Sequence, residues 1–238
     1  NNVDDWQYYT LIYNLYNLNF SPIYDPTIEY SKFLSFPIYS ILYHALFLKI
    51  FDIYGFIIVS FLTIFIFFYL LITFFQSVGF NIFYSALITT TIFCLANFVN
   101  YFDLNIEYLN AIGELYGLRI PRPSITHLYF FLFLTLLISI TKPDQFNFKK
   151  LAIIGATFAL MWGSFYYYLA ISTLIFLIYY FYILVETNKF KISTIIKNFT
   201  ILGIFFIFFS VPLIFILVKS EPDYLVRVGL VNLDLNKK

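Results

Sequence analysis

Two adjacent carboxylates near the start of the chain are its first candidates for chemistry. Asp4 and Asp5 are followed closely by the aromatic residues Trp6, Tyr8 and Tyr9. Paired carboxylates can bind a divalent cation or accept a proton from a hydroxyl group. The alternative is a solvated loop in which an aspartate caps the start of a helix. We take Asp4 and Asp5 as candidate catalytic residues and candidate ligands of a divalent metal, the only cofactor that the sequence suggests.

A second set of polar residues recurs with helical spacing between positions 100 and 123. Asn100, Asp103, Glu107, Asn110 and Glu114 are spaced three, four, three and four residues apart. This spacing puts all five on one stripe of a helix. The stripe either lines an aqueous cavity or is the water-facing side of a surface helix. For the first case, Asp103, Glu107 and Glu114 are candidate substrate-binding residues.

Cationic and imidazole side chains supply the remaining candidates. Arg119 and Arg122 alternate with prolines directly before an apolar run, and guanidinium groups match the geometry of a phosphate. The alternative for both arginines is anchoring at lipid headgroups. His44 and His127 are lone histidines, which are more often packed than ligating. We include His44 among the substrate-binding candidates.

The composition indicates the class of protein that must position these residues. Of 238 residues, 61% are hydrophobic and 11% are charged, whereas soluble domains average about 25% charged. The net charge of +1 gives no reason to expect nucleic acid as a partner. The single cysteine, Cys94, excludes an internal disulfide. We therefore predict an integral membrane protein in contact with the lipid bilayer.

Apolar runs predict an all-α, polytopic transmembrane bundle of about six spans. Crossing the hydrocarbon core takes roughly 20 apolar residues in a helix. One run is too long for a single span and predicts two short helices that meet near Trp162. No span carries a charge near its middle, which disfavours an ion channel or proton pump. The runs are Ile53 to Phe75, Ile82 to Val99, Ser124 to Thr141, Leu151 to Leu184 (two helices) and Phe199 to Val218.

Lysine-rich loops predict the orientation. The segments 142–150 and 187–197 carry three lysines each, which is typical of cytoplasmic loops. The stretch Phe36 to Phe51 is short and contains His44 and Lys49, so we favour a helix that lies in the membrane interface. In that case residues 1–35 and 100–123 share the outer side. If the stretch crosses, these two segments fall on opposite sides.

These features predict one membrane domain, 1–238, truncated at both ends. Residues 1–52 form an outer loop with a juxtamembrane helix. Residues 53–218 hold the transmembrane spans and the outer loop 100–123. Residues 219–238 begin a further outer loop.

Two N-terminal motifs resemble those of the GT-C class of membrane glycosyltransferases. Asp4-Asp5 with Tyr8 is similar to the acidic pair with a following aromatic in that class's first extracytoplasmic loop. The segment 36–39, Phe-Pro-Ile-Tyr, followed by 49–51, Lys-Ile-Phe, resembles the Pro-Pro-Leu-Tyr and Phe-Lys-Leu-Phe-Gly sequences of a juxtamembrane helix. The chain departs from that pattern at Phe36 and at Asp52, where Pro and Gly are usual. The motifs cover about the first fifty residues, and the remainder is similar in architecture only.

The resemblance implies a bacterial inner-membrane (plasma-membrane) enzyme that uses a polyprenyl-phosphate-linked sugar. An acid of the Asp4/Asp5 pair would then activate the acceptor or bind a metal. We infer from their charge that Arg119 and Arg122 would hold the carrier's phosphate. A transporter or flippase for lipid-linked glycans would use the same outer cavity without chemistry. A non-catalytic assembly subunit would leave these residues scattered.

Overall fold

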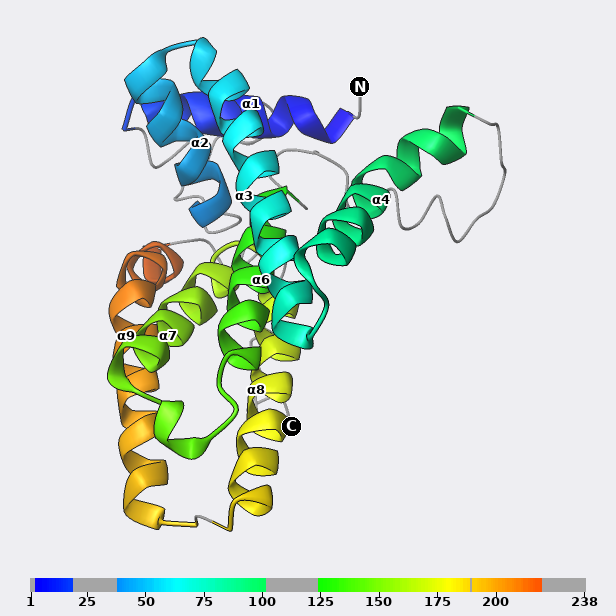
Figure 1. Cartoon of the computed structure of the whole chain (residues 1–238). Coiled ribbons are helices and arrows are strands. Elements are labelled where there is room, and N and C mark those ends of the chain that lie inside the picture. The colour runs from blue at the N-terminus through cyan, green and yellow to red at the C-terminus, as the bar shows by residue number, and fades with distance from the viewer. Residues whose placement is uncertain (1–2, 19–37, 102–123, 189, 220–238) are drawn as a thin grey trace, which may run out of the picture.

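The computed structural model describes residues 3–18, 38–101, 124–188 and 190–219, and every regular element in these ranges is helical (Figure 1). The predicted all-α class is therefore confirmed for this part of the chain. The elements are α1 (Val3–Tyr16), α2 (Ile38–Phe51), α3 (Tyr54–Val78), α4 (Ile82–Tyr101), α6 (Ser124–Ile138), the 3₁₀ turn η1 (Pro143–Gln145), α7 (Phe148–Trp162), α8 (Tyr166–Glu186) and α9 (Ile192–Lys219).

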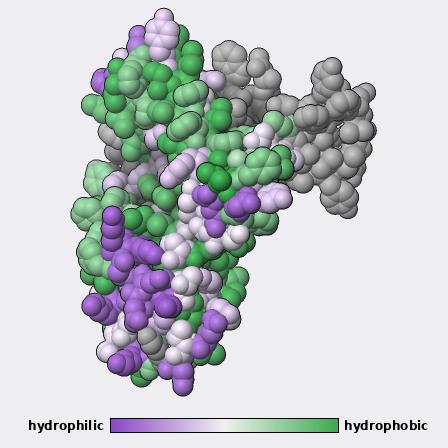
Figure 2. Space-filling model, viewed as in Figure 1, coloured by the Kyte–Doolittle hydropathy of each residue, from purple (hydrophilic) through white to green (hydrophobic). Residues whose placement is uncertain are grey.

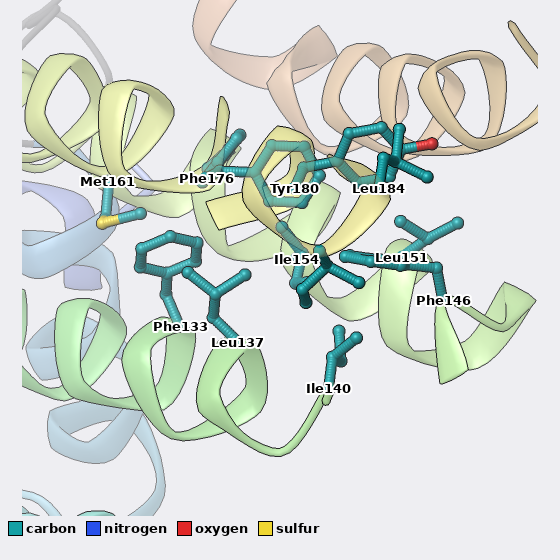
Figure 3. Close-up of a cluster of buried hydrophobic side chains, with 12 residues drawn as sticks. Phe133, Leu137, Ile140, Phe146, Leu151, Ile154, Met161, Phe176, Tyr180 and Leu184 are labelled. Carbon is teal, nitrogen blue, oxygen red and sulfur yellow. The ribbon is translucent and has the colours of Figure 1, made fainter. Parts of the chain in front are cut away.

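Helices α6, α7, α8 and α9 form a bundle around a shared apolar core. Figure 3 shows side chains from α6, α7 and α8 converging, with Phe133, Ile154 and Tyr180 among them. Phe146, from the segment between η1 and α7, packs edge-on against the Tyr180 ring at 4.7 Å between centroids. Edge-to-face aromatic pairs add to the stability that burial alone provides. The many aromatic residues of the sequence are thus used as core at this end of the bundle.

Helices α7 and α9 are the most extensively paired helices among the described residues. A glycine permits this close approach, because a Cβ at Gly155 would come within 2.5 Å of the Leu202 carbonyl oxygen. Inside a bilayer the hydrophobic effect does not drive helices together, so close backbone packing at small residues becomes a main source of association.

The long apolar run from 151 to 184 forms two helices, as predicted. Helix α7 ends at Trp162, Gly163 follows as its C-cap, and α8 begins at Tyr166. The segments at the opposite ends of these helices, before α7 and after α8, line one cavity. The two lysine-rich segments therefore lie at the same end of the bundle, which the predicted topology requires.

Helices α1, α2 and the first part of α3 form a second packing unit. Leu11, Ile12 and Leu15 of α1 are buried against a face of α2 that includes Ile41 and Ala45. In Figure 1, α1 lies across the direction of α3, beside the upper end of the bundle. Helices α2 and α3 follow one another through a sharp turn at residues 52–53.

Three described helices are long and apolar enough to cross a membrane: α3, α8 and α9 over Ile192–Phe215. The outward side of α3 carries Ile57, Phe61 and Phe65, each more than 60% exposed. Their spacing of four residues makes one continuous apolar stripe, and Figure 2 shows that hydrophobic surface covers much of this face of the molecule. Exposed apolar surface on this scale fits lipid rather than water, so the chain is best described as a membrane protein.

Two sequence-based boundaries differ from the structure. The sequence places residues 3–16 in a loop, but they form α1, because the apolar positions of this short polar segment are buried only through contact with α2, the next described helix. Helix α9 begins at Ile192, inside the expected loop 187–197, because the Lys191 carbonyl accepts backbone hydrogen bonds from Thr194 and Ile195 and so starts the helix. The acidic stripe predicted within 100–123 lies outside the described residues, except for its first member in α4.

Candidate functional site

Helix α1 carries the acidic pair in its first turn. Asp4 and Asp5 are the second and third residues of α1, and their side chains lie outside what the structure describes. Acidic residues in a first turn interact favourably with the helix dipole, which accounts for part of their placement without any chemistry. Consecutive helical residues point about 100° apart, so only one of the two carboxylates faces a given direction.

Tyr39, in the segment that resembles the Pro-Pro-Leu-Tyr motif, joins α2 to the bundle. Its backbone N–H donates to the Gly163 carbonyl at 3.3 Å, and its hydroxyl donates to the Phe209 carbonyl of α9. The ring lies directly against Gly163, where a Cβ would collide with it. One side chain thus ties the start of α2 to the α7–α8 turn and to α9. We call this contact of Tyr39, Gly163 and Phe209 the tyrosine junction.

The tyrosine junction lies next to a proline in α9. Pro212 lacks an N–H and leaves one carbonyl of the preceding turn without its helical partner. The Tyr39 hydroxyl enters α9 in this turn, where it meets the Phe209 carbonyl and the Leu213 backbone N–H. The carbonyl that Pro212 leaves without a partner is that of Phe208, four residues earlier, so the Tyr39 hydroxyl bonds the next carbonyl along and does not replace the bond lost at the proline.

Each residue of the tyrosine junction is followed in the sequence by a buried serine. Ser40, Ser164 and Ser210 each directly follow one of its residues and are fully buried. Their Oγ atoms have no hydrogen-bond partner within the described part of the chain. Uncompensated hydroxyl groups in an apolar surrounding cost free energy, so this is a polar contact region inside an otherwise apolar protein.

His44 is packed one turn further along α2. Its side chain is 2% exposed, and Nδ1 lies 2.9 Å from the Ser40 carbonyl. A carbonyl oxygen only accepts, so Nδ1 carries the proton. Burial among apolar groups lowers the pKa of His44, partly offset by this hydrogen bond. A neutral, packed histidine explains these contacts fully, and substrate binding by His44 stays a prediction.

The start of α6 is fixed at the same end of the bundle. His127 is buried, with its ring stacked on Phe67 of α3 at 5.8 Å between centroids. It also contacts Tyr168, near the start of α8, at 5.7 Å. These contacts explain why the second lone histidine is inside the protein. They also place the start of α6 beside the start of α8.

The remaining predicted site residues are not placed by the structure. Asp103, Glu107, Glu114, Arg119 and Arg122 lie outside the described residues. Within the described ranges, no three His, Cys, Asp or Glu side chains gather into a metal-binding group. The structure packs α1 on α2, and it packs Tyr43 and Phe47 of α2 against the apolar cluster that contains the start of α6. The geometry of the acidic and cationic side chains stays a prediction.

Sequence reasoning does not single out Tyr39 as an anchor. The available signals are its place in the resembling motif and the Gly163 turn between two apolar helices. Each signal alone is common in membrane proteins, and their pairing depends on a contact between residues 124 positions apart in the sequence.

No protein family, curated protein or solved structure matches this chain. A family assignment consequently rests on the motifs themselves and on where the fold places their helices.

Proposed function

We propose that this chain acts as a GT-C-type membrane glycosyltransferase, which moves a sugar from a polyprenyl-phosphate carrier to an acceptor at the outer face of the membrane. One observation supports the proposal most strongly. Helix α1, with the Asp4/Asp5 pair, packs on α2, whose Tyr39 is held at the α7–α8 end of the bundle. Helix α6, which follows Arg119 and Arg122 in the chain, begins at this same end.

In the proposed reaction, one acid of the pair accepts the proton of the acceptor hydroxyl as its oxygen attacks the sugar. The bond between the sugar and the carrier's phosphate breaks, and the phosphate gains negative charge. Arg119 and Arg122 stabilise that charge. Asp103, Glu107 and Glu114 form the opposite wall of the cavity and hydrogen-bond the sugar.

The acidic pair also fits a divalent metal ion by ligand type, because carboxylate oxygens are the preferred ligands of hard cations. The helical geometry of α1 limits that fit, since the two side chains point in different directions. A bound ion would neutralise the phosphate of the carrier. Further ligands would have to come from other segments of the chain.

The proposed membrane arrangement has six spans: α3, α4, α6, α7, α8 and α9. Helices α1 and α2 lie at the outer surface of a bacterial inner membrane, and the lysine-rich segments face the cytoplasm. Two observations support this arrangement. Helices α1 and α2 lie at one end of α8 and α9, and the two lysine-rich segments lie at the other end. Helix α7 has 15 residues and is about 22 Å long at 1.5 Å per residue. Because the hydrocarbon core is about 30 Å thick, residues of the segments that flank α7 would have to complete the crossing.

Transfer from labelled carriers tests the proposal. The full chain in lipid vesicles is given a panel of polyprenyl-phosphate monosaccharides, and loss of the labelled sugar from the lipid is measured. We expect Asp4→Asn or Asp5→Asn to slow transfer by about a hundredfold or more, the usual contribution of a general base. Asp52→Asn is the matched control, because Asp52 is an exposed carboxylate with φ of 52°, a backbone conformation that asparagine also adopts.

The outcomes separate the competing functions. If both aspartate variants transfer sugar as fast as Asp52→Asn, the proposed active site is wrong. If the intact lipid-linked sugar moves between leaflets and no sugar is released, the protein is a flippase or transporter. If neither process occurs with any carrier in the panel, an assembly subunit replaces the enzyme as the best description.

A further inference from the structure

A cavity of roughly 700 Å³ lies at the end of the bundle opposite the tyrosine junction. It is bounded by η1 and the start of α7 on one side, by the end of α8 and by the first turns of α9. None of the residues assigned to sugar transfer lines it. Figure 2 shows that hydrophilic surface gathers toward this lower part of the molecule, below the mainly hydrophobic upper part.

The polarity of the cavity changes along one face of α9. Thr194, Lys197, Asn198 and Ile201 all line it, and their spacing of three, one and three residues puts them on one helical stripe. Lys191, one turn earlier, is also part of the lining. The stripe therefore runs from two ammonium groups and a hydroxyl to a buried amide, and then to an apolar side chain.

The floor of the cavity is tightly packed and mostly apolar. Phe146 and Tyr180 are buried in the bundle core and pack edge to face, as Figure 3 shows. Asn198, 6% exposed, donates from Nδ2 to the Tyr180 hydroxyl at 3.1 Å. This hydrogen bond fixes the amide at the border between the polar mouth and the apolar floor.

Charge at the mouth favours an anion. Lys191 and Lys197 contribute two positive charges, against the one carboxylate in the lining, Asp144. The first turn of α9 begins at the same place, where the Lys191 carbonyl accepts backbone hydrogen bonds from Thr194 at 3.0 Å and Ile195 at 3.1 Å. The positive end of the dipole of this 28-residue helix adds to the two lysines.

We propose that this cavity binds an anionic lipid, with its headgroup phosphate between Lys191, Thr194 and Lys197 and its acyl chain toward Ile201. Basic pockets between membrane helices on the cytoplasmic side bind headgroups of this kind. The rim supports a lipid over a free ion, because Phe148 and Ile192 beside the mouth are 62% and 75% exposed and would lie against acyl chains. The inference does not depend on sugar transfer, since the site lies at the other end of α8 and α9.

Native mass spectrometry of the full chain, released from detergent, tests the proposal. We expect the protein to retain phosphatidylglycerol in preference to phosphatidylcholine. Lys197→Gln and Lys191→Gln are each expected to weaken phosphatidylglycerol retention about tenfold, the usual effect of losing a charged hydrogen-bond donor. Lys197→Arg keeps the charge and is expected to retain the lipid.

The control is Lys49→Gln, which removes one exposed lysine from α2, far from the cavity along the fold. Equal retention of the two lipids, or equal loss in Lys197→Gln and Lys49→Gln, would overturn the proposal. Displacement of the lipid by inorganic phosphate at equal concentration would show an anion site without lipid selectivity, which also contradicts it. If Lys197→Gln fails to fold, weak retention by the folded Lys197→Arg protein would decide against the lipid site.

Discussion

At the scale of single residues, the tyrosine junction illustrates how polar groups are used in a chain with few charges. Tyr39 makes two hydrogen bonds to backbone carbonyl groups of different segments, and its ring fits against Gly163. The hydroxyl contact needs a tyrosine, because only tyrosine carries a hydroxyl at the end of an aromatic ring. The ring contact needs a glycine at 163, because any side chain there would collide with the ring. The sequence displays both residues, and only the fold shows that they meet.

Removing the Tyr39 hydroxyl should destabilise the protein. We expect Tyr39→Phe to cost about 1 kcal/mol, the net value of one internal hydrogen bond, and Gly163→Ala to cost more because its Cβ would displace the Tyr39 ring. The apparent unfolding temperature in detergent micelles measures both. Tyr69→Phe, on the exposed side of α3, is the control. Unchanged unfolding in both junction variants would show that α2 is not held by this contact.

His44 should make stability dependent on pH. Burial holds its pKa in the folded protein below the ordinary value of 6.5, so protonation favours the unfolded state. The stabilising contribution of the neutral form is complete above 6.5 and decreases as the pH falls below that value. The His44→Asn variant keeps a side-chain donor for the Ser40 carbonyl but has no group that titrates at this position.

The unfolding temperature of wild type should therefore fall more steeply than that of His44→Asn between neutral pH and about pH 5. The second buried histidine, His127, is the same in both proteins, so its effect cancels in the comparison. Parallel curves for the two proteins would contradict the buried, neutral state of His44.

At the scale of elements, hydropathy predicts helices well and their contacts poorly. The two short helices on either side of Trp162 are predictable because an apolar run of 34 residues, 151–184, is too long for one span. Helix α1 is not predictable in this way, because its apolar residues are buried only by contact with α2. The close pairing of α7 and α9 is also absent from the sequence-based prediction, since one glycine within an apolar run is a weak signal on its own.

A glycine pair tests the packing of α7 against α9. Gly155→Ala is expected to lower the apparent unfolding temperature, because the new methyl group would meet the Leu202 carbonyl and push the backbones apart. Gly203→Ala, in α9, is the matched control, since an added Cβ there meets no atom within 4 Å. Replacing glycine by alanine in a helix is otherwise stabilising. A higher unfolding temperature in Gly155→Ala would mean that the two helices do not cross closely at this point.

At the scale of the whole molecule, the two proposals concern opposite ends of the bundle. Helices α1, α2 and the start of α6 gather at the α7–α8 turn, whereas the lysine-rich segments and the proposed lipid cavity lie at the other end. The lysine pattern predicts this separation, because short lysine-rich loops are typical of the cytoplasmic side of a membrane. It does not predict the cavity, which depends on how η1 lies beside α8 and α9.

The central claim is that the acidic pair and the arginines face one cavity at the outer end. Spin labels on Asp5→Cys and Arg122→Cys, in a Cys94→Ser background, measure this separation by pulsed electron resonance. We predict a distance of roughly 15 to 25 Å, which is room for a sugar phosphate and an acceptor plus the label linkers. A distance of about 30 Å or more, the thickness of the hydrocarbon core, would place the two groups on opposite sides of the membrane and contradict the account.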